Sequence, residues 1–118
     1  MMATALSEKL NELISRASRE SRAAEADLYL RRAKIAAAEE RFDVARVFCQ
    51  KAIETDAQNL EALFCLARTL EVGFAETDAA IALYQKIIAL AGYEGANPCC
   101  AAAREALSAL GSAGNRQG

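Results

Sequence analysis

The chain has 118 residues, 53% hydrophobic and 6% aromatic, and its 14 basic and 16 acidic residues leave a net charge of −2. That length suits one domain with one core, and the near-neutral charge provides no field to hold a nucleic-acid backbone, so we expect no nucleic-acid partner. Much of the apolar content is alanine, and no long alternating Val/Ile/Thr run occurs. The composition therefore predicts tightly packed helices and essentially no strand.

The first expected element is an amphipathic helix from about Ala5 to about Arg19. Its apolar residues recur at helical spacing on one side and form a candidate docking stripe: Leu6, Leu10, Leu13 and Ile14. Burying each is worth roughly 1.5 to 3 kcal/mol, so the stripe should either cap the domain or dock on another subunit. Charged residues interrupt this stripe, so we expect neither a secretory signal nor a membrane span. We therefore expect a cytoplasmic protein.

Residues 18–24 are polar and charged, so a hinge or a weakly held helical link is expected there, with Ser21 as a candidate N-cap. It divides an N-terminal segment, residues 1–23, from a helical domain at residues 24–110. Two helical patterns follow, from about Ala23 to Glu40 and from Phe42 to about Thr55. They predict the first antiparallel pair.

The second pair begins after Asn59, the expected N-cap of a helix that reaches Val72. Gly73 should end that helix by taking the left-handed conformation. Thr77 or Asp78 should cap the next helix, which ends near Ala91-Gly92.

A last helix is expected over residues 98–110, with Asn97 as its N-cap and Pro98 in its first turn. Gly111 should end it, and residues 111–118 read as a disordered tail. This helix would cover the apolar face left by the second pair. About six helices are expected in all.

One pattern occurs twice between Ala26 and Leu90. Ala33 and Ala67 lie 34 residues apart, and the Gln-Lys pairs at 50–51 and 85–86 lie 35 apart. A period held through two helical patterns indicates a repeat of two antiparallel helices. The units span about 26–59 and 60–94.

These residues resemble the tetratricopeptide repeat (TPR) family. The first unit carries Ala33, Phe42-Asp43, Ala45 and Gln50-Lys51-Ala52, and the second Leu66-Ala67, Ala80-Ile81 and Tyr84-Gln85-Lys86. Tyr29 and Leu63 stand where the family often has tryptophan. The resemblance implies an all-α fold in which antiparallel helix pairs form a short right-handed solenoid with N- and C-terminal capping helices.

In that family the first helix of each pair lines a concave groove, so the resemblance also implies a partner-binding site. Its residues pair across the units at a separation of 34: Asp27 with Glu61, Leu30 with Phe64, and Lys34 with Arg68. They would form an apolar floor and a basic stripe for an amphipathic helix or an extended acidic segment. The alternative is that the N-terminal helix covers Leu30 and Phe64, and that Lys34 and Arg68 are ordinary solvated charges.

One type of TPR protein clamps a partner's C-terminal carboxylate with lysine and asparagine side chains. Leu30 stands where the first lysine would be, and Lys34 and Cys65 stand where asparagines would be. Recognition of chaperone tails by that clamp is therefore not expected.

Catalytic chemistry has few candidates, because the chain has no histidine, no Gly-rich phosphate loop and no nucleophile motif. We expect no catalytic residue, no cofactor and no metal site. The four cysteines should be reduced and packed as small hydrophobes. A thiol-based redox role for Cys99 and Cys100 is the alternative, since a helix N-terminus stabilises a thiolate.

The sequence therefore predicts a non-enzymatic protein–protein interaction module, an adaptor that binds another protein or its own copies. The alternative is a scaffold or accessory subunit of a larger assembly, such as a small protein that resembles a secretion chaperone and shields a helical client.

Overall fold

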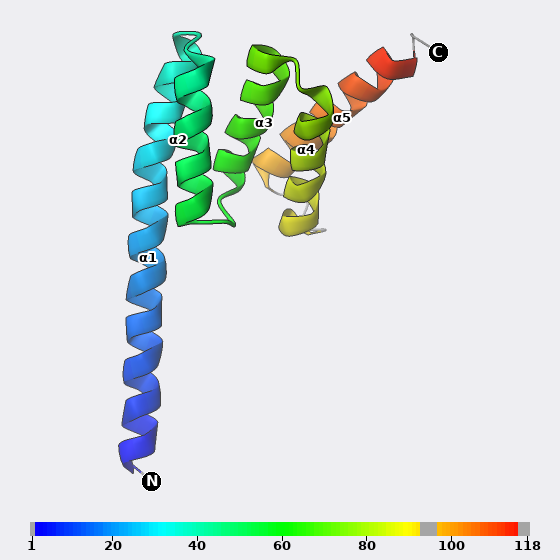
Figure 1. Ribbon diagram of the computed structural model, residues 1–118. Helices are drawn as coiled ribbons and strands as arrows, with labels where there is room; N and C mark the ends of the chain where they lie inside the picture. The colour runs from blue at the N-terminus through cyan, green and yellow to red at the C-terminus, as the bar shows by residue number, and fades with distance from the viewer. Residues whose placement is uncertain (1, 93–96, 116–118) are drawn as a thin grey trace.

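The computed structural model describes residues 2–92 and 97–115, and over those ranges the chain is all-α, with five helices and no strand. The helices are α1 (Met2–Ala38), α2 (Phe42–Thr55), α3 (Leu60–Phe74), α4 (Thr77–Ala91) and α5 (Pro98–Asn115). α1 to α4 stand side by side with alternating direction, and α5 crosses obliquely (Figure 1). The predicted all-α class is confirmed.

α1 is one uninterrupted helix where the sequence predicted two helices and a link. Residues 18–24 contain neither glycine nor proline, and their arginine, glutamate and alanine residues are good helix formers, so nothing there breaks the helix. Ser21 lies inside α1 and is not an N-cap. Because the two expected segments are continuous, the described chain has five helices and not about six.

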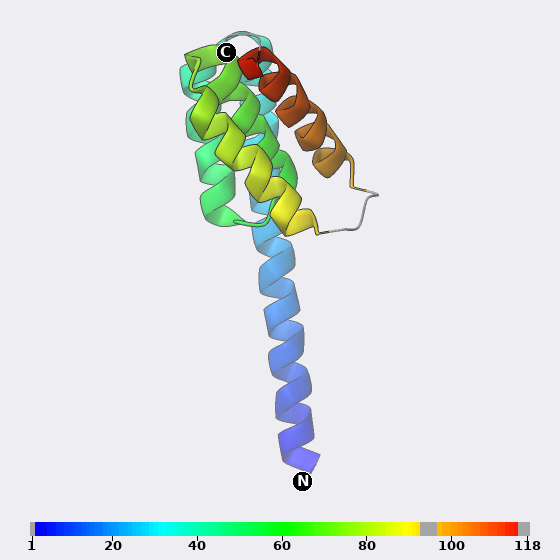
Figure 2. The same cartoon turned by 90° about the vertical axis from the view of Figure 1, so that its right-hand side faces the viewer.

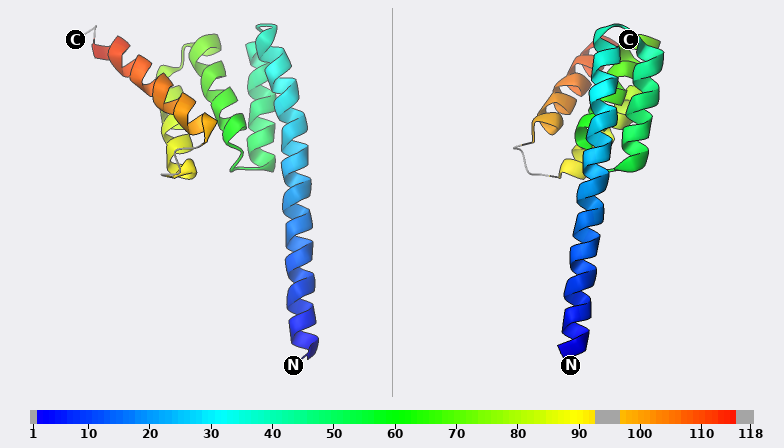
Figure 3. Two further views of the ribbon diagram at one scale, coloured as in Figure 1. Left: turned by 180° about the vertical axis from the view of Figure 1, so that it is seen from behind. Right: turned by 90° about the vertical axis from the view of Figure 1, so that its left-hand side faces the viewer.

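The N-terminal half of α1 projects from the rest of the molecule. At 1.5 Å per residue a helix of 37 residues is about 55 Å long, and the longest dimension of the molecule is 67 Å. No other helix lies beside this half in any of the views (Figures 1, 2 and 3). The predicted docking stripe consequently caps none of the described helices, and Leu6, Leu10, Leu13 and Ile14 are 57–68% exposed.

The packed body consists of two antiparallel pairs, α1 with α2 and α3 with α4, and of α5 against the second pair. Alanines are fully buried at corresponding places in both pairs, and small side chains let helix axes approach closely. Buried positions match at spacings of 34 residues between α1 and α3 and of 35 between α2 and α4. The matching residues are Ala33 with Ala67, Ala45 with Ala80, Cys49 with Tyr84, and Ala52 with Ile87.

The end of α3 differs from the predicted one. Gly73 lies inside the helix, and Ala75 takes the left-handed conformation with φ 54°. Gly73 is required for another reason: a methyl group at that position would overlap the side chain of Phe42 at the start of α2. Close approach of two helices, and not a positive φ, therefore explains this glycine.

Two predicted N-caps are confirmed. The Asn59 side chain accepts a hydrogen bond from the Ala62 backbone N–H at 3.1 Å, at the start of α3. The Asn97 side chain accepts one from the Cys99 N–H at 2.8 Å, and α5 begins at Pro98 as predicted. These polar residues satisfy donors that have no partner within the helix.

Two other predicted helix ends are wrong. α4 begins after Glu76 without a side-chain cap, so neither Thr77 nor Asp78 caps it, although it ends at Gly92 as expected. α5 continues through Gly111 to Asn115, because a single glycine weakens a helix without breaking it. Of the predicted tail, residues 116–118 lie outside the described residues.

Candidate functional site

An open cavity of about 1000 Å³ lies between α1, α3 and α5, and we call it the α1–α3–α5 groove. Its apolar lining includes Ala37, Ala38, Leu60, Phe64, Val72 and Ala102. Its polar lining includes Lys34, Glu40, Asn59, Glu61, Arg68 and Thr69. A cavity with this lining can bury the apolar face of a ligand and form hydrogen bonds or ion pairs with the polar groups of that ligand.

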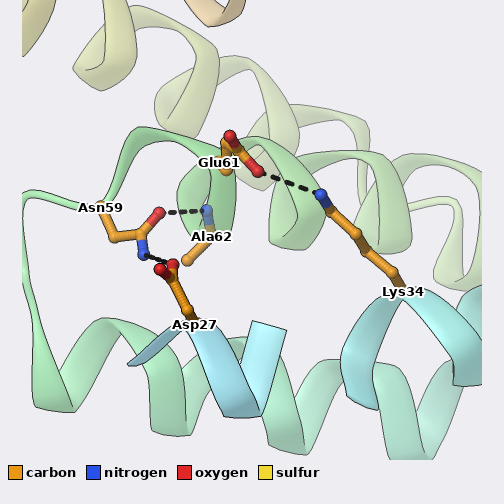
Figure 4. A network of polar contacts seen from close by, with 5 residues as sticks. All are labelled: Asp27, Lys34, Asn59, Glu61 and Ala62. Atoms are coloured by element: carbon orange, nitrogen blue, oxygen red, sulfur yellow. Dashed lines mark hydrogen bonds and ion pairs between the residues drawn. The ribbon is translucent and has the colours of Figure 1, made fainter. Parts of the chain in front are cut away.

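Four of the six residues predicted for a partner-binding groove line this cavity: Lys34, Glu61, Phe64 and Arg68. Asp27 lies beyond its lining, where its side chain accepts a hydrogen bond of 3.5 Å from Asn59 (Figure 4). The matched positions of α1 and α3 thus meet at one surface, except for Asp27 and Leu30.

Leu30 is the second exception: it is buried in the core and does not line the groove. Only 4% of it is exposed, and it packs in a cluster with Ala26, Ala52 and Ala62 from α1, α2 and α3. It lies on the same side of α1 as Ala26 and Ala33, both fully buried. Its counterpart Phe64 is half-buried and does reach the groove. The projecting half of α1 covers neither residue.

The predicted basic stripe is neutralised by acidic partners. Lys34 Nζ lies 3.0 Å from Glu61 Oε2, which joins α1 to α3 (Figure 4). This hydrogen bond raises the pKa of Lys34 above its ordinary value. Arg68 lies 3.3 Å from Glu71. The groove therefore presents alternating charges and has no single-sign field for an acidic segment.

Arg68 belongs to a polar network that reaches α4. The Tyr84 hydroxyl donates to Glu71 Oε1 at 2.8 Å, and Arg68 donates to Glu71 Oε2. Burial, together with the bond to Glu71, raises the pKa of Tyr84 to about 12. The ring of Tyr84 also packs on that of Phe64, with 5.8 Å between centroids. A fully buried side chain of α4 thus positions two residues of the groove.

The contribution of α5 to the groove was missed from the sequence. Asn97, Pro98, Cys99 and Ala102 all line it. The 34-residue spacing already contained the signal, since Ala102 lies 34 positions after Arg68 and Cys99 lies 34 after Cys65. Extending the register of the two units by one more helix would have placed both residues in the groove.

All four cysteines are free. Hydrogen bonding to Cys65, reinforced by burial, raises the pKa of Cys49, and the same bond lowers the pKa of Cys65, which also faces the charge of Lys34. Burial raises the pKa of Cys99, which is the opposite of what a reactive thiolate at the start of α5 requires. Cys100 is buried.

Among the described residues no three or more His, Cys, Asp or Glu side chains gather as metal ligands would. None of the described helices combines the length and the apolar character needed to cross a bilayer. Comparisons of the chain with protein-family models, with curated proteins and with solved structures return no match. Two surfaces stand out by their geometry, the α1–α3–α5 groove and the projecting half of α1.

Proposed function

We propose that this chain is a non-enzymatic, TPR-like helical-repeat module that binds a helical segment of another protein in the α1–α3–α5 groove. The matched burial of the two helix pairs, at spacings of 34 and 35 residues, supports the repeat. Ala102 and Cys99 support it further, because they carry the same spacing onto α5. α5 would then cover the exposed end of the second unit.

The observation that carries the binding function is the groove itself. Its volume of about 1000 Å³ matches roughly two to three turns of a helix about 10 Å across. Phe64 and the alanines of α1 and α5 provide an apolar floor, and Lys34 and Arg68 stand above it beside Glu61 and Glu71. A fitting ligand is an amphipathic helix with one apolar stripe flanked by charges of both signs.

A second candidate function, a subunit of a larger assembly, is favoured by the exposed stripe of α1. Leu6, Leu10, Leu13 and Ile14 are more than half exposed, on the N-terminal half of α1, beside which no other described helix lies. Apolar stripes of this size mark interaction surfaces. The two functions are compatible, since the stripe and the groove lie on different parts of the molecule.

The groove is tested by selecting helical peptides on the purified wild-type chain from a displayed library, and measuring their affinity by fluorescence anisotropy. The double variant Phe64→Ala/Arg68→Asp should bind the selected peptides at least about tenfold more weakly, because it removes floor and rim together. Ala102→Arg, which fills the groove from α5, should have the same effect without removing a core contact.

The matched control is Val47→Ala/Lys51→Asp, which makes the same two kinds of change on the exposed surface of α2, away from the groove. It should leave affinity unchanged. Circular dichroism establishes that each variant remains helical. Equal affinity of the selected peptides for wild type, Phe64→Ala/Arg68→Asp and Ala102→Arg would show that the groove is not the binding site.

A further inference from the structure

The side of α1 that faces away from the body is apolar along most of the helix. α2 to α5 all lie to one side of α1 (Figures 1 and 3), and Ala26, Ala33 and Ala36 face them. At about 100° per residue, a different set points the opposite way. We call this set the α1 seam: Leu10, Ile14, Ala17, Ser21, Ala24, Leu28, Arg31 and Ile35.

The α1 seam has the spacing of a coiled-coil interface, since its members follow one another by four and three residues in strict alternation. All eight are exposed, and its large members, Leu10, Ile14, Leu28 and Ile35, are 57–60% exposed. Leu28 and Ile35 belong to the part of α1 that packs on the body, but they lie on the side of the helix that faces away from it. The seam therefore continues well beyond the N-terminal stripe and is suited to a long helix, not to a short cap.

We infer that α1 pairs with α1 of a second copy of this chain, antiparallel, along the α1 seam. A two-fold interface uses the same surface on both copies, and one long seam with no counterpart elsewhere on the described chain meets that requirement. A parallel pair in register would set Arg31 against Arg31 of the partner subunit, which places like charges together. An antiparallel pair separates them.

The side chains select one antiparallel register. With Leu10 opposite Leu28 of the partner subunit, Ile14 faces Ala24 of the partner subunit, and Arg31 faces Ser7 of the partner subunit near the end of the contact. If the partner were shifted by one heptad so that Leu10 faced Ile35 of the partner subunit, Arg31 would face Ile14 of the partner subunit. The charge of Arg31 would then be buried beside an apolar group. Small residues at Ala17, Ser21 and Ala24 occupy the middle of the pair and let the two axes approach closely.

The contact is large enough for a stable dimer. In this register residues 3–35 of the two copies run alongside each other over roughly 48 Å, and a helix is about 10–12 Å across. A strip of that length and width on each copy covers on the order of 1,000 Å² in total, which is the area that a specific interface needs. In one copy the body lies on one side of α1, beside its C-terminal half (Figures 1 and 3). In the antiparallel pair the two bodies would therefore lie on the outer sides and at opposite ends, where they would not obstruct the pairing.

Sedimentation equilibrium of the full chain tests this pairing, and wild type should be a dimer. Leu28→Glu should weaken association at least about tenfold, because a carboxylate would be buried at the seam without a partner. Ser15→Glu, an equally exposed site on the other side of α1, is the matched control and should dimerise like wild type. A monomeric wild type, or a Leu28→Glu variant that dimerises normally, would overturn the inference.

A rescue experiment tests the direction of pairing. In the double variant Leu10→Glu/Leu28→Lys each glutamate would face a lysine of the partner subunit, so association should recover relative to either single variant. In a parallel dimer the same variant would set like charges together and stay monomeric, which would overturn the antiparallel arrangement. The inference is independent of the groove, and Phe64→Ala/Arg68→Asp should dimerise like wild type.

Discussion

The N-terminal half of α1 and the whole of α3 both carry leucines three and four residues apart, with opposite outcomes. In α3, Leu63, Leu66 and Leu70 are 1–8% exposed, whereas Leu6, Leu10 and Leu13 of α1 are 58–68% exposed. α3 contacts every other helix of the molecule, and the projecting half of α1 contacts none of them. Helical spacing thus defines an apolar face, but only the neighbouring elements determine whether that face becomes core.

The largest expected effect comes from truncating one leucine in each region. Leu63→Ala should lower the free energy of unfolding by about 2–5 kcal/mol, because it removes buried contacts and leaves a cavity. Leu6→Ala should change it by no more than about 0.5 kcal/mol, since that side chain is 68% exposed. Urea denaturation followed by circular dichroism measures both, and similar losses for the two variants would contradict the contrast between the regions.

A pair of glycines sharpens the same contrast. Gly73→Ala should destabilise the fold by about 1–3 kcal/mol, because the added methyl group overlaps Phe42 where α3 meets α2. Gly111→Ala should instead stabilise α5 by about 0.5–1 kcal/mol, since it lies within the helix and nothing surrounds its added methyl group. Thermal unfolding compares the two, and a neutral Gly73→Ala would show that α2 can shift without cost.

The features that could be predicted from the sequence depend on local geometry or on the 34-residue spacing. Asn59 and Asn97 were found as N-caps because a short polar side chain just before a helix has one main use. Lys34, Phe64 and Arg68 were assigned to one surface from the TPR resemblance, in which the first helix of each pair lines a groove, together with the 34-residue spacing between α1 and α3. Neither inference required the contacts between this chain's own helices.

The features that could not be predicted depend on contacts between helices. Whether Leu30 belongs to the core or the groove is decided by how α1 rotates against α2 and α3, which no local pattern records. The ion pair between Lys34 and Glu61 likewise joins residues of two helices, 27 positions apart in the chain, and neutralises the expected basic stripe. Gly73 was recognised as special, but its reason, the nearness of Phe42, exists only in the folded chain.

The smallest of the three expected differences tests a contact that fixes α3 from α4, a kind of contact that the projecting half of α1 lacks. Tyr84→Phe should lower stability by about 1–2 kcal/mol at neutral pH, because it removes a hydrogen bond to the charged Glu71. Folding raises the pKa of Tyr84 from about 10 to about 12, so the protonated hydroxyl favours the folded state.

The contribution of Tyr84 is therefore fully present below about pH 10 and is lost as the pH rises through about 12. The stability difference between wild type and Tyr84→Phe should shrink across that window, while lysine titration affects both proteins alike and cancels in the comparison. Urea denaturation at pH 7, 10 and 11.5 measures this difference. A difference that stays constant with pH would mean that the Tyr84 hydroxyl does not anchor Glu71, and that the pair of Arg68 with Glu71 is held at the groove without support from α4.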